Sequence, residues 1–318
     1  MRSRISALLA VLLSVAGLFI ALPGTLYAYT VYPAKFLFDI KKDFLQPSDI
    51  AIGKDHQIYV LDGVNNCVKV FDAQGRYLFA FGSKGNQPGQ FNSPLGIAAD
   101  KAGRICVADS QNHRVQIFAS GGEWLQSVDI VSAKGDKPSD PTDMAIDESK
   151  QQMYVVDNDN HHVHVYGLPG YKQIASWATE GERRDQLQYP FFIAVGIDSS
   201  VLVVDVINTR VQVYSPTGDV VGTIGGWGVD LGQFYRPKGV CVDPDNQIFV
   251  SDSYLGVIQV FNRYGNFKGV IGDEKGDILK WKTPVGIAVD DRGRLYVVDM
   301  IANQVKVYDL SGNKINKP

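Results

Sequence analysis

The sequence predicts an all-β fold, a six-bladed β-propeller of four-stranded antiparallel blades, and three observations lead to this prediction. A proline recurs six times at spacings of 47 to 49 residues, and an aspartate follows it with nearly the same period. Between them lie runs of five to seven residues rich in β-branched and aromatic side chains, separated by Gly, Asp, Asn or Pro, as is typical of strands and turns. Four such runs in about 47 residues match one propeller blade. The two series are Pro47, Pro94, Pro141, Pro190, Pro237 and Pro284, and Asp62, Asp109, Asp157, Asp205, Asp252 and Asp299.

The first 28 residues differ from the rest of the chain. Arg2 and Arg4 precede an uncharged stretch from Ile5 to Leu22, and a Pro-Gly pair and a small residue, Ala28, follow it. This layout is that of a secretory signal, and an uncleaved membrane anchor is the alternative. We therefore expect residues 1–28 to be a signal peptide or anchor, residues 29–318 to form one propeller, and the protein to be extracytoplasmic, either periplasmic or secreted.

The second repeat shows the four expected strands in order, over residues 94–100, 103–109, 112–118 and 121–128. Its pattern, P-L-G-I-A-A-D, G-R-I-C-V-A-D and N-H-R-V-Q-I-F, resembles the NHL repeat of six-bladed propellers. The resemblance is close at 94–118 and 284–308 and partial at 47–71, 141–166, 190–214 and 237–261. It implies six blades and a fold that serves many functions, so it does not by itself name one.

The last repeat lacks a fourth strand, because only ten residues follow Tyr308 and they contain no apolar run. A suitable run, Lys35–Ile40, lies ahead of the first repeat. A propeller that left its ends unpaired would expose strand edges that promote aggregation. We therefore predict that residues 35–40 pair with Gln304–Tyr308 and close the ring.

The composition limits the choice of partner. The chain has 31 basic and 34 acidic residues, and this balance argues against a nucleic-acid partner. The three cysteines, Cys67, Cys106 and Cys241, form no metal or haem motif, and we expect them to behave as small apolar residues. We expect a monomer that touches a membrane only through an uncleaved N-terminal segment.

The repeated aspartates are predicted to be structural, because an Asp after a strand accepts backbone hydrogen bonds that fix the turn. Arg114 and Arg210 occupy the usual arginine position of the repeat. Each is expected to tie a loop to a neighbouring carboxylate.

Aromatic residues gather around the repeated prolines of repeats 4–6. In propellers the starts of the first strands and the loops between second and third strands share one face around the central channel, which we call the channel face. Aromatic and arginine side chains anchor protein partners, so we expect half of this face to bind a protein or peptide. Phe191 and Phe234 are expected to pack between blades instead. The partner-binding candidates are Tyr189, Phe192, Tyr235, Arg236, Tyr254 and Trp281.

Metal-dependent chemistry is the alternative. Enzymes with six-bladed architecture include peptide-amidating lyases, which carry NHL-like repeats, and lactonases. Asp49 and Asp143 follow their prolines, and His162 and His164 share one face of a strand. His162 and His164 also align with Arg114 and Gln116 of the second repeat, which makes a structural role the simpler interpretation. We expect no cofactor, with calcium or zinc as the alternative, and a binding scaffold rather than a metal-dependent lyase or lactonase.

Overall fold

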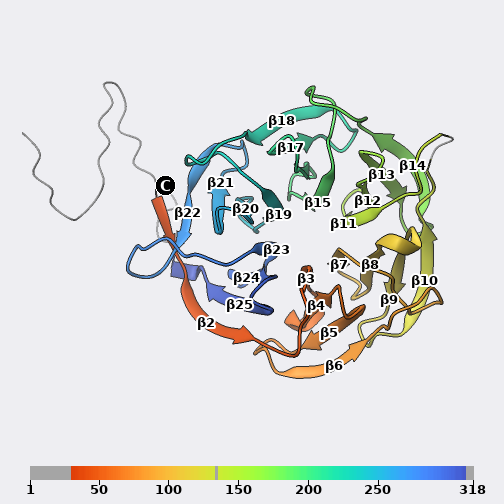
Figure 1. The fold of residues 1–318 in the computed structure, drawn as a ribbon, viewed down its shortest axis with the longest axis horizontal. Helices are drawn as coiled ribbons and strands as arrows, with labels where there is room; N and C mark the ends of the chain where they lie inside the picture. The colour runs from red at the N-terminus through yellow and green to blue at the C-terminus, as the bar shows by residue number, and fades with distance from the viewer. Residues whose placement is uncertain (1–29, 133–134, 313–318) are drawn as a thin grey trace, which may run out of the picture.

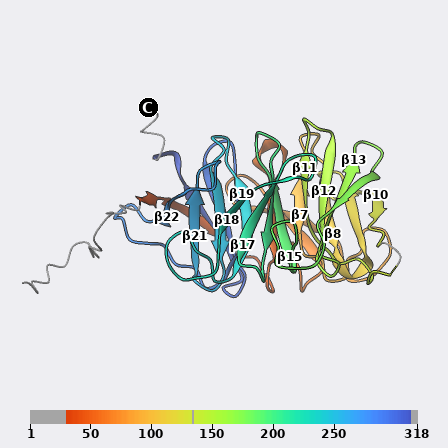
Figure 2. The same ribbon diagram turned by 90° about the horizontal axis from the view of Figure 1, so that it is seen from above.

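In the computed structural model, which describes residues 30–132 and 135–312, six sheets stand in a ring around a central channel (Figure 1). Seen from the side, the strands run from one face of the ring to the other (Figure 2). The predicted fold class is confirmed. Two single-turn 3-10 helices, Lys54–His56 and Ser110–Asn112, are the only helices of the described part.

Each blade begins at the channel and ends at the rim. Blade 1 contains β3 (Asp49–Ile52), β4 (Ile58–Asp62), β5 (Cys67–Phe71) and β6 (Tyr77–Phe81). Blade 2 contains β7 (Ile97–Ala99), β8 (Ile105–Asp109), β9 (Arg114–Phe118) and β10 (Trp124–Asp129). Blade 3 contains β11 (Pro141–Asp147), β12 (Gln152–Asp157), β13 (His162–Gly167) and β14 (Lys172–Trp177).

The second half of the ring repeats this order. Blade 4 contains β15 (Pro190–Val195), β16 (Val201–Asp205), β17 (Arg210–Tyr214) and β18 (Val220–Gly225). Blade 5 contains β19 (Pro237–Val242), β20 (Ile248–Asp252), β21 (Val257–Phe261) and β22 (Phe267–Gly272). Blade 6 contains β23 (Pro284–Val289), β24 (Arg294–Asp299) and β25 (Gln304–Asp309), and it is completed by β2 (Lys35–Ile40).

The ring closes as the sequence predicted. Strand β2 pairs antiparallel with β25, and its register places Phe36 opposite Tyr308 and Ile40 opposite Val305. Closure buries Ile40 against the core between blades 6 and 1. The segment before the first repeat therefore removes the open edge that the short sixth repeat would otherwise leave.

An additional strand precedes the closing strand. Strand β1 (Thr30–Pro33) pairs in parallel with β22 at the rim of blade 5, with Thr30 opposite Gly269 and Pro33 opposite Gly272. Blade 5 is therefore five-stranded. The repeat pattern of the sequence did not predict this pairing.

The repeated aspartates are structural, as predicted. Each carboxylate accepts a hydrogen bond of 2.7–3.0 Å from a backbone N–H just before the repeated proline of its own blade. These bonds hold the loop between the second and third strands against the start of the first strand. Arg114 and Arg210 add the expected tie: each Nε donates to its blade's aspartate, and Nη2 donates to carbonyls of the preceding interblade loop.

The core lies between neighbouring blades. The middle strands are buried on both sides, and the largest enclosed side chains include Tyr59, Phe91 and Phe234. Phe91 and Phe234 reach the core from the loops that join blades, so Phe234 packs between blades as predicted. The three cysteines are unpaired.

The expected signal peptide or anchor lies outside the described residues. Within residues 30–132 and 135–312, no helix is long and apolar enough to cross a membrane.

Candidate functional site

The channel face carries a ring of loop tips, one per blade. The residue two positions after each repeated aspartate stands at the same place in every loop between second and third strands. In blades 4, 5, 6 and 1 this residue is apolar and about half exposed or more, whereas blades 2 and 3 carry Gln111 and Asp159. We call the four apolar residues the apolar arc: Ile207 (57% exposed), Tyr254 (64%), Ile301 (52%) and Val64 (50%).

A pair of stacked tyrosines lies in the middle of the arc. The rings of Tyr235 and Tyr254 have centroids 4.1 Å apart and an interplanar angle of 27°. Asp252 fixes the backbone at both tyrosines, because its carboxylate accepts hydrogen bonds from both of their backbone N–H groups. Arg236 is exposed beside them. The structure therefore brings together three of the predicted partner-binding residues on one blade.

Tyr189 lies where blade 4 begins, against blade 3. Its side chain is 41% exposed, and its ring packs edge-on against His161 at 4.8 Å. The backbone N–H of Tyr189 also donates to His161 Nδ1. The contacts with His161 fix the position of Tyr189 while part of its ring stays exposed, and a fixed, exposed aromatic ring suits a recognition surface.

Two predicted binding residues are not on the surface, and for these the prediction was wrong. Phe192 is 3% exposed and packs in the core between blades 4 and 5. Trp281 is 5% exposed and packs edge-on against Tyr308 between blades 5 and 6. Phe192 and Trp281 lie close to a repeated proline, as the exposed Tyr189 and Tyr235 do. Their side chains, however, point into the space between blades, where the burial of a large apolar area is favourable.

Part of the exposed apolar surface was not predicted from the sequence. Ile207, Ile301 and Val64 were overlooked, although their shared distance from the repeated aspartate was a usable signal. A shallow cavity of about 170 Å³ adjoins the apolar arc on blade 5. Trp227, which is 75% exposed, lies in the loop between β18 and β19, and this loop also supplies part of the cavity wall. Apolar residues from three segments line this cavity: Val229 and Leu231, Leu255 and Val257, and Val270 and Ile278.

The channel itself holds a buried pair of carboxyl groups. Asp49 and Asp143, from blades 1 and 3, line a narrow cavity of about 180 Å³ with apolar residues of every blade. Each carboxylate accepts one backbone N–H at 2.9 Å from the next blade, Ile97 for Asp49 and Ile193 for Asp143. The structure thus places two of the four predicted metal ligands on the same cavity within the channel.

Burial controls the titration of this pair. It raises the pKa of Asp49 to about 8, although backbone hydrogen bonds from Ile97 and Ile50 act in the opposite direction. Burial and then the charge of Asp49 raise the pKa of Asp143 well above its ordinary value. Two like charges in one apolar cavity are unfavourable, so the pair retains protons near neutral pH.

A lysine that was not among the predicted site residues lies in the innermost strand of blade 5. The ammonium group of Lys238 lies 4.0 Å from the ring centroid of Phe191. Burial, with a smaller contribution from Arg236, lowers the pKa of Lys238 to about 8. Its signal in the sequence was a charged residue inside an otherwise apolar strand, Pro237–Val242.

The two predicted histidine ligands lie apart from the carboxyl pair, within blade 3. His164 Nε2 lies 3.3 Å from Asp157 Oδ2, and Gln173 Nε2 lies 3.0 Å from His164 Nδ1. Both ring nitrogens of His164 are therefore engaged. Burial alone would raise the pKa of Asp157, but hydrogen bonds from His164 and its other partners lower it to about 2. His164 thus does what Gln116 does in blade 2, where the amide donates to Asp109, and this favours the structural interpretation.

His162 does not complete a metal site. Its Nδ1 lies 3.1 Å from the carbonyl of Ala178, and its Nε2 lies 3.8 Å from an Asp136 carboxylate oxygen. Among the described residues, one group of three has ligand atoms close enough for a metal, and it is His56, Asp290 and Asp291. Asp290 is already bound by Arg292 and by the hydroxyl of Tyr296.

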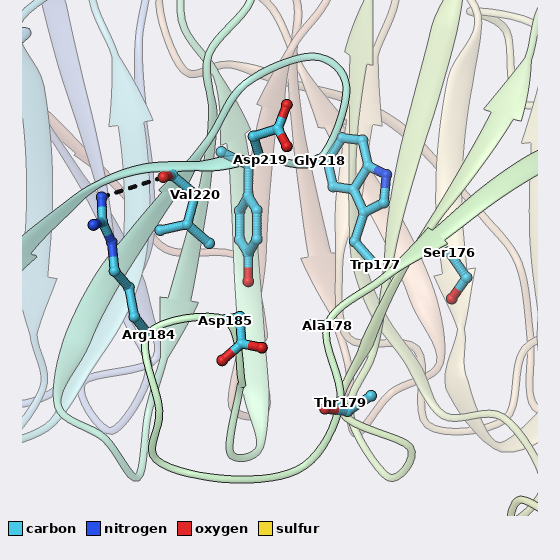
Figure 3. A pocket seen from close by; sticks show the side chains of 10 residues that line it. Ser176, Trp177, Ala178, Thr179, Arg184, Asp185, Gly218, Asp219 and Val220 are labelled. Atoms are coloured by element: carbon cyan, nitrogen blue, oxygen red, sulfur yellow. Dashed lines mark hydrogen bonds between the residues drawn. The ribbon is translucent and has the colours of Figure 1, made fainter.

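A larger groove, of about 680 Å³, lies at the rim between blades 3 and 4 (Figure 3). The stacked rings of Trp177 and Tyr214, 5.7 Å apart, form its inner wall. The Tyr214 hydroxyl is buried and has no hydrogen-bond partner among the residues that the structure describes. Arg184 and Asp185 stand at the opening of the groove. Arg184 donates a hydrogen bond to the carbonyl of Val220 at the start of β18.

Comparison with known proteins identifies the repeat. The sequence matches the NHL repeat family over residues 44–71, 91–118 and 234–261, which lie in blades 1, 2 and 5. No curated protein matches the sequence.

Solved structures share the fold at low sequence identity. A gluconolactonase from Xanthomonas campestris is 14% identical, with a TM-score of 0.65, and the match covers 91% of this chain and 99% of that one. A catalytically inactive virginiamycin B lyase from Staphylococcus aureus with quinupristin is 12% identical, with a TM-score of 0.60 and coverage of 84% and 82%. Hydrazine synthase from Kuenenia stuttgartiensis is 11% identical, with a TM-score of 0.59 and coverage of 84% and 96%. At these identities the likeness concerns the fold alone. The chain contains NHL repeats, in blades 1, 2 and 5, and it forms a six-bladed β-propeller.

Proposed function

We propose that the protein is a binding scaffold that recognises a protein or peptide through the apolar arc of its channel face. The observation that carries the proposal is the exposure of four apolar loop tips on consecutive blades, with Tyr235 stacked on Tyr254 among them. Contiguous exposed apolar surface on a folded protein marks an interaction site. Blades 2 and 3 present polar residues at the same positions, so the surface is one-sided.

The charges beside the arc define the partner further. Arg236 and Lys282 are exposed near the stacked tyrosines, and Lys280 donates to the carbonyl of Leu255. Basic side chains around an apolar centre complement a segment with aromatic or aliphatic anchors and acidic flanks. The proposed ligand is therefore an apolar, acidic-flanked segment of another protein.

We also propose that this scaffold acts outside the cytoplasm, on the basis of the N-terminal sequence. Arg2, Arg4 and the uncharged stretch that follows them have the layout of an export signal. Cell fractionation with intact-mass analysis tests this proposal, since a full-length protein in the cytoplasm would contradict it.

Selection from a random peptide library tests the binding proposal. Peptides selected on the wild-type protein should carry aromatic or aliphatic anchors. They should bind the variant Tyr235→Ser/Tyr254→Ser at least tenfold more weakly, because removal of central aromatic anchors costs about 2 kcal/mol or more. Equal affinity for both proteins would overturn the proposal.

Tyr264→Ser provides the matched control. Tyr264 is 71% exposed on the same blade, but it lies in the turn between β21 and β22, on the opposite face. This variant should bind the selected peptides with unchanged affinity. A loss of affinity equal to that of the arc variant would mean that the peptides do not recognise the channel face.

The metal-dependent lyase or lactonase remains the alternative, and the donor set does not favour it. Asp49 and Asp143 meet in the channel, but each uses one oxygen to accept a backbone N–H, and burial favours the protonated form of the pair. Hard cations need several ionised or carbonyl oxygen ligands. Elemental analysis of tag-free protein tests this alternative, and stoichiometric calcium or zinc lost in Asp49→Asn would support it.

A further inference from the structure

Two rim strands, β18 and β22, share a glycine pattern that the other blades lack. Their sequences are Val-Val-Gly-Thr-Ile-Gly and Phe-Lys-Gly-Val-Ile-Gly. The first glycine occupies the same register in both, because Gly222 pairs with Val213 and Gly269 pairs with Val260. At this register the remaining rim strands carry Phe38, Phe79, Gln126 and Ala175.

In β22 the glycine is required by the strand that covers it. A Cβ on Gly269 would lie 1.8 Å from the carbonyl oxygen of Thr30 and 2.8 Å from the Tyr32 ring. Strand β1 therefore fits against β22 only because a hydrogen atom occupies this position. Under β1, the last four residues of β22 are buried.

In β18 nothing in the described chain requires the same glycine. A Cβ on Gly222 would meet Val213 Cβ at 3.7 Å and Cγ2 at 3.9 Å, which is ordinary contact, and its φ lies outside the left-handed region. Glycine inside a strand costs about 0.5–1 kcal/mol relative to alanine. The edge beyond it is open in the described structure: β18 ends its sheet, and Val221 is 57% exposed.

We propose that the open edge of β18 is a second binding site, which takes an extended segment of a partner protein as a parallel fifth strand of blade 4. Strand addition to an exposed edge supplies main-chain hydrogen bonds, and side-chain pockets supply specificity. The segment lies along Gly222–Gly225 as β1 lies along Gly269–Gly272. It has the chemistry of Thr30–Pro33: uncharged, with a β-branched residue, an aromatic residue and a proline that ends the pairing.

The groove in Figure 3 continues this site. A parallel segment that begins opposite Gly222 brings the residues before it toward Val220, which lines the groove. The exposed side chains of Arg184 and Asp185 stand at the opening of the groove, where they can pair with a polar residue. The groove therefore selects a polar residue ahead of the apolar stretch.

The occupant is a separate protein rather than a second copy. The N-terminal strand of each copy is covalently joined to the closing strand and already pairs with its own β22. An intramolecular partner benefits from a high effective concentration, so β1 is not released to a neighbouring molecule.

Titration with a synthetic peptide of residues 30–34, capped at both ends, tests the proposal. On protein labelled with ¹⁵N-glycine, millimolar peptide should shift the amide signals of Gly222 and Gly225, whereas Gly269 and Gly272 should not move because β1 covers them. In Gly222→Val the affinity for the peptide should fall at least tenfold, read from the Gly225 signal. Unmoved Gly222 and Gly225 signals would overturn the proposal.

Two controls separate the remaining outcomes. Ile174→Thr changes an exposed residue (55%) on the rim strand β14, which lacks the glycine, and should leave peptide binding unchanged. Equal peptide binding by wild type and Gly222→Val, with both folded, would place the peptide elsewhere and refute the role of β18. A concentration-dependent dimer that the peptide dissociates would assign the edge to a second copy and refute the separate partner.

Discussion

The carboxyl pair of Asp49 and Asp143 should make the protein less stable as the pH rises from 5 to 8. Burial raises the pKa of Asp49 to about 8 in the folded state, whereas the unfolded chain has the ordinary value of 3.8. Between these values the folded state holds a proton that the unfolded chain releases. The stability is therefore complete below the unfolded pKa and is lost as the pH rises toward the folded pKa.

The size of this effect follows from the number of protons retained. Each retained proton contributes a slope of about 1.4 kcal/mol per pH unit to the free energy of unfolding. Over three pH units, one proton on Asp49 corresponds to a loss on the order of 4 kcal/mol. Asp143, whose pKa is raised in the same direction, adds to this loss.

The double variant Asp49→Asn/Asp143→Asn should remove the effect. An asparagine has nearly the shape of a neutral aspartic acid, and its carbonyl oxygen can still accept the N–H of Ile97 or Ile193. Urea unfolding followed by tryptophan fluorescence at pH 5, 6, 7 and 8 should give a flatter pH profile for the variant and a higher stability than wild type at pH 8.

Asp39→Asn is the control. Asp39 lies on β2, its side chain is 37% exposed and it forms an ion pair with Lys41, so this variant should keep the wild-type pH profile of stability. The histidines are the same in wild type and in the variants, so their contribution to the pH dependence of stability cancels when the profiles are compared. Parallel profiles for wild type and the double variant would refute the reasoning, because they would mean that the pair retains no proton in the folded state.

Three further predictions concern stability. Trp281→Ala should lower the free energy of unfolding by about 3–5 kcal/mol, because a buried aromatic leaves a cavity, whereas Tyr254→Ala should change it by less than about 0.5 kcal/mol; thermal unfolding of both checks this contrast. Gly269→Val should displace β1 and increase hydrogen exchange at the rim of blade 5, whereas Gly222→Val should leave exchange unchanged; equal exchange in both variants would contradict the asymmetry of the two strands. His164→Gln, which restores the residue found in other blades, should leave both the melting temperature and the zinc affinity measured by calorimetry unchanged; loss of a stoichiometric zinc ion would show that the histidine is a ligand.

The sequence alone determined the blade count, the strand order and the closure of the ring. Each repeated unit carries its own strand pattern, its own proline and its own aspartate, so local hydrogen bonds suffice to specify a blade. Closure followed from the same logic, because the sixth repeat lacked one strand and Lys35–Ile40 supplied one. The structural roles of the aspartates and of Arg114 and Arg210 were predictable for the same reason.

Only the tertiary structure decided which side chains reach the surface and which segments meet. Tyr235 and Trp281 both precede a repeated proline by two or three residues, yet one is exposed and the other fills the space between two blades. Asp49 and Asp143 lie 94 positions apart in the sequence and meet only because the ring brings the inner strands of its blades to one channel. The pairing of β1 with β22 likewise depends on the close approach of the two backbones at Gly269, which the repeat pattern does not contain. Exposure and contact across blades arise from packing between units, whereas the repeat pattern describes each unit by itself.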